Sequence, residues 1–353
     1  MNLKKKLIIE IPLVIFILAA GFFILRTISA RSMFPFKEQP DVTEMTKFLL
    51  AEKDPAKQIA YLKQFVKDHL NVTEVQRAYQ DIMLQFGRGE EIAKEYREYL
   101  IRNPEDPMFN YLFGRLAVGS AAEGCYKKSL ETDENYYWGH LGLAYYYFND
   151  AAPRKADLAK DHLAKALKID KSKPHAYFSL LTIYRAEKNK TKALEMLEIL
   201  TKFFPDRDYL FLEYADLKFP DKLEHKKALE KKLMKIPHSS LIEKALADLA
   251  LAEGQWDEAQ RYLESTLKDE KFDHQLWMIA HYQLAEIFGK KKDSAQTLAH
   301  LKDAVKNGWQ EYAGTRDNPN FSFLRDNAEF KSLLKGIEPK KTEPSKTAPV
   351  EKI

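Results

Sequence analysis

The sequence predicts an all-α fold in which short helix-turn-helix hairpins stack as an α-solenoid, preceded by one N-terminal transmembrane helix. Three observations lead to this prediction. Apolar residues recur at helical offsets in successive pairs of short segments. Glycine and proline are sparse, at 13 and 15 of 353 residues, which disfavours a β-rich chain. A long apolar run lies close to the N-terminus.

The N-terminal segment, residues 1–31, is almost continuously apolar from Leu7 to Leu25. As a helix this run would be roughly 28 Å long, close to the hydrocarbon thickness of a bilayer. A cluster of three lysines precedes it, at residues 4–6. We therefore expect a single-pass signal anchor, with the body of the chain on the exported (periplasmic or extracellular) side of the membrane.

A cleavable signal peptide is the alternative for the same segment, with Ile28-Ser29-Ala30 as the cleavage site. The length of the apolar run and the position of Arg26 after it favour the anchor. Residues 32–41 contain two prolines and are expected to form a linker. The five basic residues and one acidic residue of 1–31 account for the whole net charge of +4. The neutral remainder offers no basic face for nucleic acid.

The first hairpin after the linker is expected over residues 42–70, where Lys53-Asp54-Pro55 separates two apolar faces. The clearest hairpin spans Pro174 to Pro205. Its apolar positions form one face on each of two short helices: Tyr177, Leu180, Leu181 and Tyr184, then Ala193, Leu197 and Leu200. Such a hairpin cannot bury its faces alone, so it requires neighbours on both sides.

This hairpin resembles a tetratricopeptide repeat (TPR), a 34-residue unit with favoured residues at fixed positions. Counted from Pro174, the residues named above match those positions without a gap, although Leu181 is large where the family favours a small residue. Similar units begin at Thr73, Pro107 and Asn135. Two later units contain matching residues at Gly254 to Ala259 and around Leu284. The unit with Trp138 needs extra residues in its turn. The resemblance implies a TPR solenoid over 42–308.

Residues 309–337 depart from the repeat and resemble the closing segment of many bacterial TPR proteins, with matching residues at Asp317, Pro319, Phe321, Leu324, Arg325, Phe330 and Leu334. A segment of this kind would cover the apolar end of the solenoid. Residues 338–353 are rich in lysine, proline, threonine and glutamate, which predicts a disordered tail.

No catalytic constellation emerges from the sequence. The histidines form no H-E-x-x-H motif, and no phosphate loop, G-x-S-x-G elbow or dinucleotide fingerprint is present. The single cysteine, Cys125, excludes an intramolecular disulfide, and a buried thiol is the simplest interpretation of it. We therefore expect a chain that is not an enzyme and that has no metal, cofactor or small-molecule substrate.

A protein or peptide partner is the remaining expectation. The TPR resemblance implies that positions 2, 5, 9, 12 and 13 of each unit line a concave, partner-binding face. In two adjacent units these positions include aromatic residues and an arginine, as in protein-interaction hot spots. Packing of the tyrosines between repeats is the alternative for these residues. The predicted partner-binding residues are Tyr136, Leu143, Tyr146, Tyr147, His175, Phe178 and Arg185.

The expected function is therefore that of a membrane-anchored scaffold for protein–protein interaction. Two alternatives remain open. One is a non-catalytic accessory subunit of a cell-envelope enzyme or assembly complex, and the other is an exported protein with a cleaved signal peptide. The lysine and asparagine pattern by which some TPR proteins grip chaperone C-termini is absent, because only Lys244 matches and Asp248 occupies the second position.

Overall fold

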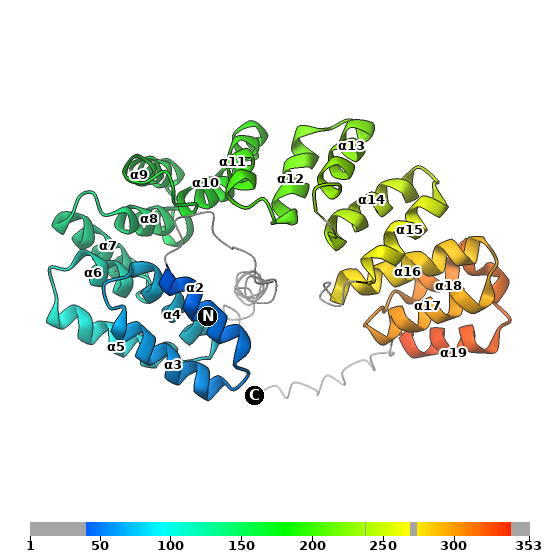
Figure 1. Cartoon of the computed structure of the whole chain (residues 1–353), viewed down its shortest axis with the longest axis horizontal. Coiled ribbons are helices and arrows are strands. Elements are labelled where there is room, and N and C mark those ends of the chain that lie inside the picture. The colour runs from blue at the N-terminus through cyan, green and yellow to red at the C-terminus, as the bar shows by residue number, and fades with distance from the viewer. Residues whose placement is uncertain (1–39, 237, 269–273, 340–353) are drawn as a thin grey trace, which may run out of the picture. The chain divides into compact units, whose positions relative to one another are not determined.

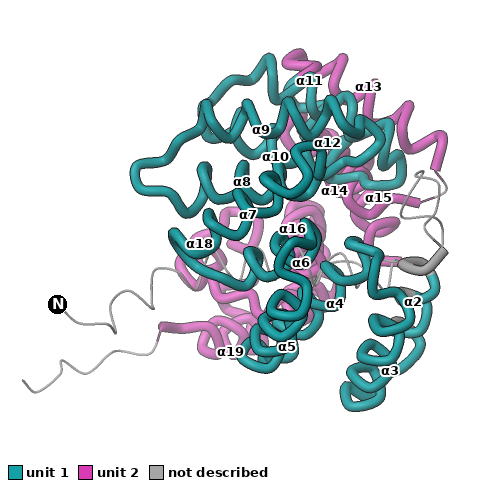
Figure 2. The backbone as a smooth tube through the Cα atoms, turned by 90° about the vertical axis from the view of Figure 1, so that its left-hand side faces the viewer, with its two compact units in different colours: residues 1–217 teal, residues 218–353 magenta. Residues whose placement is uncertain are grey.

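The computed structural model describes residues 40–236, 238–268 and 274–339, and every regular element within these ranges is a helix. The all-α prediction is confirmed for this part of the chain. The predicted anchor at 1–31 lies outside the described residues, as do nearly all of the linker and most of the tail. None of the described helices is both long enough and apolar enough to cross a membrane. The chain divides into two compact units, residues 1–217 and 218–353 (Figure 2).

The first unit consists of consecutive helical hairpins (Figure 1). Its helices are α2 (Pro40–Ala51), α3 (Pro55–Asp68), α4 (Thr73–Gln85), α5 (Gly89–Arg102), α6 (Pro107–Gly114), α7 (Ser120–Thr132), α8 (Tyr137–Tyr145), the short π-helix η1 (Tyr146–Asp150), α9 (Ala156–Ile169), α10 (His175–Ala186), α11 (Lys190–Phe203) and α12 (Asp208–Lys218).

The second unit continues with α13 (Lys222–Leu233), α14 (Ser240–Ala252), α15 (Trp256–Thr266), α16 (His274–Lys290), α17 (Ser294–Lys306), α18 (Tyr312–Asp317), the 3-10 helix η2 (Pro319–Leu324) and α19 (Ala328–Ile337). Within this unit, α14 pairs with α15 and α16 pairs with α17 as hairpins.

Local sequence chemistry fixes where many of these helices begin. The carboxylate of Asp106 accepts hydrogen bonds from the backbone N–H groups of Met108 and Phe109, and Pro107 occupies the first turn of α6. The side chains of Asp221 and Asn327 cap α13 and α19 in the same way. Each cap satisfies N–H groups that have no partner within their own helix. Capping residues and proline therefore divide the chain into short helices.

The turn inside several hairpins has a common geometry. Gly87, Lys188, Gly254 and Lys292 all have positive φ, between 56° and 73°. In each case the N–H of the next residue bonds the carbonyl five residues back, as in the 2.9 Å bond from Asn189 to Tyr184. A left-handed residue at this point closes the first helix of the hairpin and reverses the chain.

The apolar positions expected from the repeat pattern form the core. In the hairpin of α10 and α11, Leu181, Ala193, Leu197 and Leu200 are at most 3% exposed. Leu181 is therefore buried although it is larger than the residue that the family favours. The unit with Trp138 differs locally from the expectation of one regular helix. There α8 ends at Tyr145 and a π-helix carries Tyr146 and Tyr147, so these two side chains lose the register of α8.

The segment 309–337 forms α18, η2 and α19 and packs on α16 and α17. Phe321, Leu324 and Phe330 are at most 1% exposed and share a core cluster with residues such as Leu301. Gly289 permits this contact, because a Cβ atom there would lie 2.6 Å from the backbone oxygen of Asn320. These contacts are those that a covering segment at the end of the repeats would make.

Candidate protein-interaction surface

The first helices of the hairpins in unit 1 lie in one continuous row, because α4 contacts α6, α6 contacts α8, and α8 contacts α10. Small residues allow this close packing. A Cβ atom on Gly142 of α8 would lie 2.5 Å from the Tyr126 ring, and one on Gly114 of α6 would lie 2.7 Å from it. The Tyr126 side chain of α7 thus fits against two helices of the row. We call α4, α6, α8 and α10 the inner row.

A stacked arginine lies at the centre of the inner row. The guanidinium carbon of Arg77, on α4, is 3.9 Å from the centre of the Trp138 ring on α8. Tyr111, on the intervening helix α6, places its ring 5.9 Å from the same indole. Arginine over the face of tryptophan is a favourable cation–π geometry. Three successive helices therefore contribute to one aromatic and cationic cluster.

A second arginine on the inner row is fully paired. Arg115, on α6, donates hydrogen bonds to the Gln80 amide oxygen at 2.7 Å and to the Asp81 carboxylate at 2.6 Å. It also donates to the backbone carbonyl of Arg77 at 3.3 Å. Its side chain is only 19% exposed. Arg115 is therefore a structural cation that ties α6 to α4.

Arg77 differs from Arg115 in having no polar partner. Among the described residues, none forms a hydrogen bond or an ion pair with the Arg77 guanidinium, and its Nε atom is buried and unpaired. The nearest carboxylates are already used, since Asp81 pairs with Arg115 and Glu74 pairs with Lys173. Burial lowers the pKa of the Arg77 guanidinium. The cluster therefore contains one cation that has no direct hydrogen-bond or ion-pair partner among the described residues, although the nearby charges of Asp81 and Glu74 act on it.

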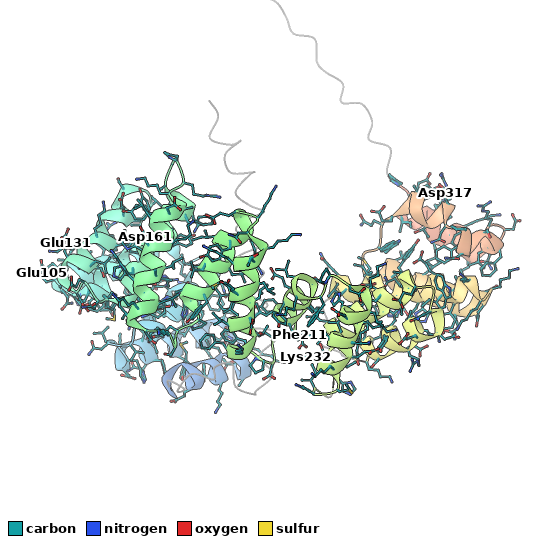
Figure 3. All side chains as sticks on the ribbon, turned by 90° about the horizontal axis from the view of Figure 1, so that it is seen from above. Glu105, Glu131, Asp161, Phe211, Lys232 and Asp317 are labelled. Carbon is teal, nitrogen blue, oxygen red and sulfur yellow. The ribbon has the colours of Figure 1, made fainter. Side chains whose placement is uncertain are left out.

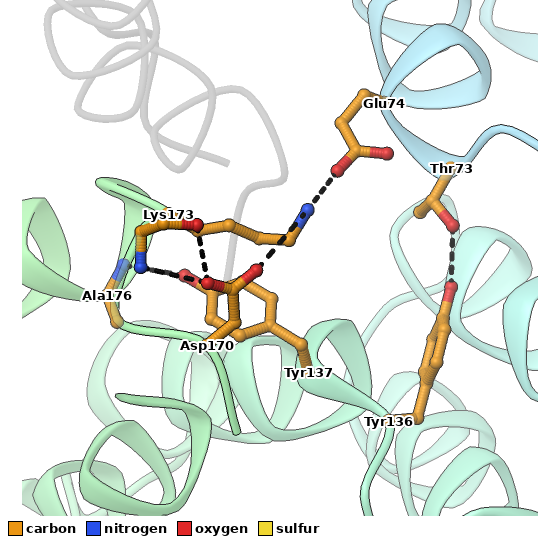
Figure 4. A network of polar contacts seen from close by, with 8 residues as sticks. Thr73, Glu74, Tyr136, Tyr137, Asp170, Lys173 and Ala176 are labelled. Carbon is orange, nitrogen blue, oxygen red and sulfur yellow. Dashed lines mark hydrogen bonds and ion pairs between the residues drawn. The ribbon is translucent and has the colours of Figure 1, made fainter. Parts of the chain in front are cut away.

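The loop before α10 closes one side of this cluster (Figure 4). The Lys173 ammonium bonds the Glu74 carboxylate and lies 3.9 Å from Asp170. The hydroxyl groups of Tyr136 and Thr73 are 2.9 Å apart, which joins the start of α8 to the start of α4. The Tyr137 hydroxyl accepts a 3.2 Å hydrogen bond from the backbone N–H of Ala176. These contacts hold residues far apart in the sequence in fixed positions around Trp138.

His175 completes the cluster at the start of α10. Its ring lies 4.7 Å from Trp138, and its Nδ1 atom is buried without a hydrogen-bond partner. Burial lowers the pKa of His175 well below its usual value, and the charges of Arg77 and Lys173 lower it further. His175 is therefore neutral at pH 7 and adds no positive charge to the cluster. We call Arg77, Trp138, Lys173 and His175 the Arg77 cluster.

The seven residues predicted to bind a partner lie in different surroundings within unit 1. Tyr136 and His175 belong to or adjoin the Arg77 cluster. Phe178 is half-buried beside Phe204, with the ring centres 5.6 Å apart. Arg185 is exposed and forms a two-point ion pair with Glu213 of α12.

The other three predicted residues lie in the core of unit 1. Leu143, Tyr146 and Tyr147 are 3%, 9% and 6% exposed. The Tyr147 hydroxyl donates a 3.1 Å hydrogen bond to Glu123. Their low exposure favours the alternative interpretation, packing between repeats.

Sequence reasoning did not select Arg77 or Arg115, although a signal for both is present. Counted from Thr73 and Pro107, they occupy positions 5 and 9 of their units, which are inner positions in the TPR count. What the count could not show is that one of them is paired and the other is not. That difference depends on contacts between helices.

The remaining titratable groups give no metal site among the described residues, where no group of three potential ligands occurs. His140 and His162 form a pair through their Nδ1 atoms at 2.9 Å, and His281 and His300 form another at the same distance. Cys125 is partly buried, and burial raises the pKa of its thiol.

Comparison with known proteins gives no family assignment. No protein-family model matches the chain, and no curated protein does. Among solved structures, the Cut9 and Hcn1 hetero-tetramer of APC/C is similar with 14% identity and a TM-score of 0.42, over 85% of this chain and 55% of that one. The chain thus spans about half the length of that protein.

Two shorter proteins are also similar. YrrB, described as a TPR protein with an unusual peptide-binding site, has 16% identity and a TM-score of 0.35, over 52% of this chain and 92% of its own. The pilF protein of Pseudomonas aeruginosa has 15% identity and a TM-score of 0.39, over 62% and 90%. Each match is partial and of low identity, so the description of the fold rests on the helices of this chain.

Proposed function

We propose that this chain is a non-catalytic TPR-type scaffold that binds a partner protein through an extended, acidic segment at the inner row of unit 1. The observation that carries this proposal is the Arg77 guanidinium, which lies on Trp138 without a counter-ion. A buried donor without a partner costs about 1–3 kcal/mol, and more when it is charged. A carboxylate from another protein would supply the missing partner.

The composition of the cluster also supports a protein partner. Arginine, tryptophan and tyrosine are the residues most enriched in hot spots, where they present a large apolar area with a polar group at its edge. Arg77, Trp138 and Tyr111 are held by packing and by the bonds of Arg115 and Lys173. Because the side chains are fixed before binding, a partner loses less conformational entropy on association.

Of the cations Arg77, Arg115 and Lys173, Arg77 is the one that has no direct acidic partner among the described residues. Asp81 pairs with Arg115, and Glu74 and Asp170 pair with Lys173. Arginine can bond a carboxylate at two points, which fixes its orientation as well as its position. We therefore assign Arg77 the role of binding an aspartate, a glutamate or a C-terminal carboxylate of the partner.

A peptide array tests this proposal on the full chain. Each acidic peptide is paired with a version in which glutamate and aspartate are replaced by their amides. Acidic peptides that bind the wild-type protein should lose about 2 kcal/mol of binding free energy when the protein carries Arg77→Gln. This loss corresponds to an increase of about thirtyfold in Kd. Arg97→Gln is the matched control, because Arg97 is exposed and lies on α5, which is not part of the inner row. Equal binding of acidic and amide peptides would exclude the proposal.

We also propose that residues 1–31 anchor the chain in a membrane, with the helical units on the exported side. The apolar run from Leu7 to Leu25 and the preceding lysines support this assignment. The protein should then resist extraction by alkaline carbonate and retain its N-terminus. Recovery of a soluble form that begins at Arg31 would instead establish the cleaved signal peptide.

A further inference from the structure

A second unpaired nitrogen lies close to Arg77, at the start of α10. The Nδ1 atom of His175, the first residue of this helix, is buried and has no hydrogen-bond partner. Among the described residues of unit 1, it and the Nε atom of Arg77 are the only buried side-chain nitrogens without a partner. The centre of the Trp138 ring is 3.9 Å from the Arg77 guanidinium carbon and 4.7 Å from the centre of the His175 ring. The two unsatisfied nitrogens therefore belong to side chains that pack on one indole.

Another buried histidine of unit 1 has both of its ring nitrogens satisfied. The Nδ1 atom of His140, on α8, lies 2.9 Å from the Nδ1 atom of His162, and its Nε2 atom bonds the backbone oxygen of Glu134 at 3.0 Å. An unsatisfied buried nitrogen costs free energy, and a phenylalanine would pack on Trp138 without that cost. Packing alone therefore does not account for a histidine at position 175.

Contacts on both sides of His175 hold this part of the chain in place (Figure 4). Two residues before it, Lys173 bonds the Glu74 carboxylate of α4. One residue after it, the backbone N–H of Ala176 donates a 3.2 Å hydrogen bond to the Tyr137 hydroxyl of α8. The start of α10 is thus tied to two other helices of the inner row before any partner binds. Groups that are held in this way lose little conformational entropy on association.

We propose that the carboxylate bound by Arg77 also accepts a hydrogen bond from the Nδ1–H group of His175. This inference rests on the proposed function and adds a second binding residue to the same site. A carboxylate has two oxygens and about four acceptor positions, so it can accept bonds from a guanidinium and an imidazole together. Both unpaired nitrogen-bearing groups then gain a partner from one ligand group.

A neutral imidazole can supply this bond. It has one N–H group, and the hydrogen bonds of the ring decide which of its two nitrogens carries the proton. The charges that face His175 are those of Arg77, Lys173 and Arg115, and they lower its pKa in addition to the effect of burial. In the free protein the ring is therefore uncharged. It acts as a hydrogen-bond donor, while Arg77 supplies the positive charge.

Two variants of equal shape test the Nδ1–H group on the full chain. His175→Asn keeps an N–H donor on the atom bonded to Cγ, as Nδ1 is, whereas His175→Leu has the same branched shape without a donor. The probe is the fluorescein-labelled acidic peptide that has the lowest Kd for the wild type and binds more tightly than its amide version. His175→Leu should raise its Kd about tenfold or more, and His175→Asn should keep it within about threefold of wild type. Fluorescence anisotropy gives the Kd values, and melting temperatures show whether both variants are folded.

A double variant tests whether the two residues bind the same carboxylate. In an Arg77→Gln background, His175→Leu should raise Kd by less than about threefold, because the carboxylate is no longer held beside position 175. Asp161→Asn is the surface control. Asp161 is exposed on α9, outside the inner row, and its replacement should leave Kd within about twofold of wild type (Figure 3).

Equal losses of affinity in His175→Asn and His175→Leu would show that the ring, and not its N–H group, is needed, and would overturn the inference. A full tenfold loss in the Arg77→Gln background would also overturn it, because the two residues would then bind different groups. Binding that depends on Arg77 but not on residue 175 would overturn this inference alone. If no acidic peptide binds more tightly than its amide version, the proposed function fails and this inference fails with it.

Discussion

The guanidinium carbon of Arg77 lies 3.9 Å above the Trp138 ring, and no described carboxylate pairs with it. On the next helix of the same row, Arg115 has three hydrogen-bond acceptors. Two arginines in one environment thus differ in whether their charge is satisfied inside the protein. This difference separates an arginine that ties two helices together from one that, in the proposed function, binds a carboxylate of the partner.

The two arginines should respond differently to removal of their charge. Arg77→Met keeps the apolar stem on Trp138 and removes an unpaired cation, so the free energy of unfolding should change by less than about 1 kcal/mol. Arg115→Met leaves the Gln80 amide oxygen and the Asp81 carboxylate without their donor, which should cost about 2–3 kcal/mol. Urea unfolding of both variants measures the difference. Similar losses for the two variants would show that Arg77 is structural.

Sequence patterns predicted the helices well because helix formation in this chain is local. Capping side chains such as Asp54 and Asn189 and the glycines Gly87 and Gly254 mark the ends of helices within a few residues. Apolar spacing likewise identified buried positions such as Leu197 and Leu200. Each of these features depends on residues that are close in the sequence.

The candidate site could be predicted only in part, because it depends on contacts that are remote in the sequence. Lys173 pairs with Glu74 across 99 residues, and Tyr136 meets Thr73 across 63. The repeat count placed Tyr136 and His175 on the inner row. It could not show that Leu143, Tyr146 and Tyr147 are buried in the core of unit 1.

The close packing of α7 and α8 predicts opposite effects at two glycines. A Cβ atom at Gly142 would lie 2.5 Å from the Tyr126 ring, whereas one at Gly124 would meet no atom within 4 Å. Gly142→Ala should therefore lower the free energy of unfolding by about 1–3 kcal/mol through overpacking. Gly124→Ala should raise it by about 1 kcal/mol, because alanine is the better residue inside α7. Urea unfolding curves of the two variants provide the measurement. Tolerance of Gly142→Ala would show that the two helices are not tightly packed there.

The shared turn geometry predicts that glycine stabilises two lysine positions. Lys188 and Lys292 have φ of 56° and 58°, where an L-residue with a Cβ atom is strained. Lys188→Gly and Lys292→Gly should each raise the free energy of unfolding by about 0.5–1 kcal/mol, after allowance for the greater freedom of glycine in the unfolded chain. The control is Lys190→Gly at the start of α11, which should lower it. Thermal unfolding measures the change in stability of each of the three variants. A change of the same sign in all three would show that the turns are not left-handed.

The two histidine pairs predict that stability falls as the pH is lowered from about 6.5 toward 4. Burial and the charge of His140 together lower the pKa of His162 to about 4. Burial and His300 likewise lower the pKa of His281 to about 4. In the unfolded chain both pKa values return to about 6.5.

Between these pH values the unfolded chain binds more protons than the folded chain, so the free energy of unfolding decreases as the pH falls. The structural reason is that each 2.9 Å contact between Nδ1 atoms needs one neutral acceptor, which protonation of both rings removes. Urea midpoints measured from pH 7 to pH 5, above the range in which most carboxylates titrate, should show this decrease.

His162→Gln and His281→Gln should each reduce the slope of the urea midpoint against pH. His238→Gln, at an exposed position, should leave this slope as in the wild type. The double variant His162→Gln/His281→Gln should retain part of the slope, because burial also lowers the pKa of His175. An unchanged slope in that variant would show that the two histidine pairs do not contribute to the acid sensitivity.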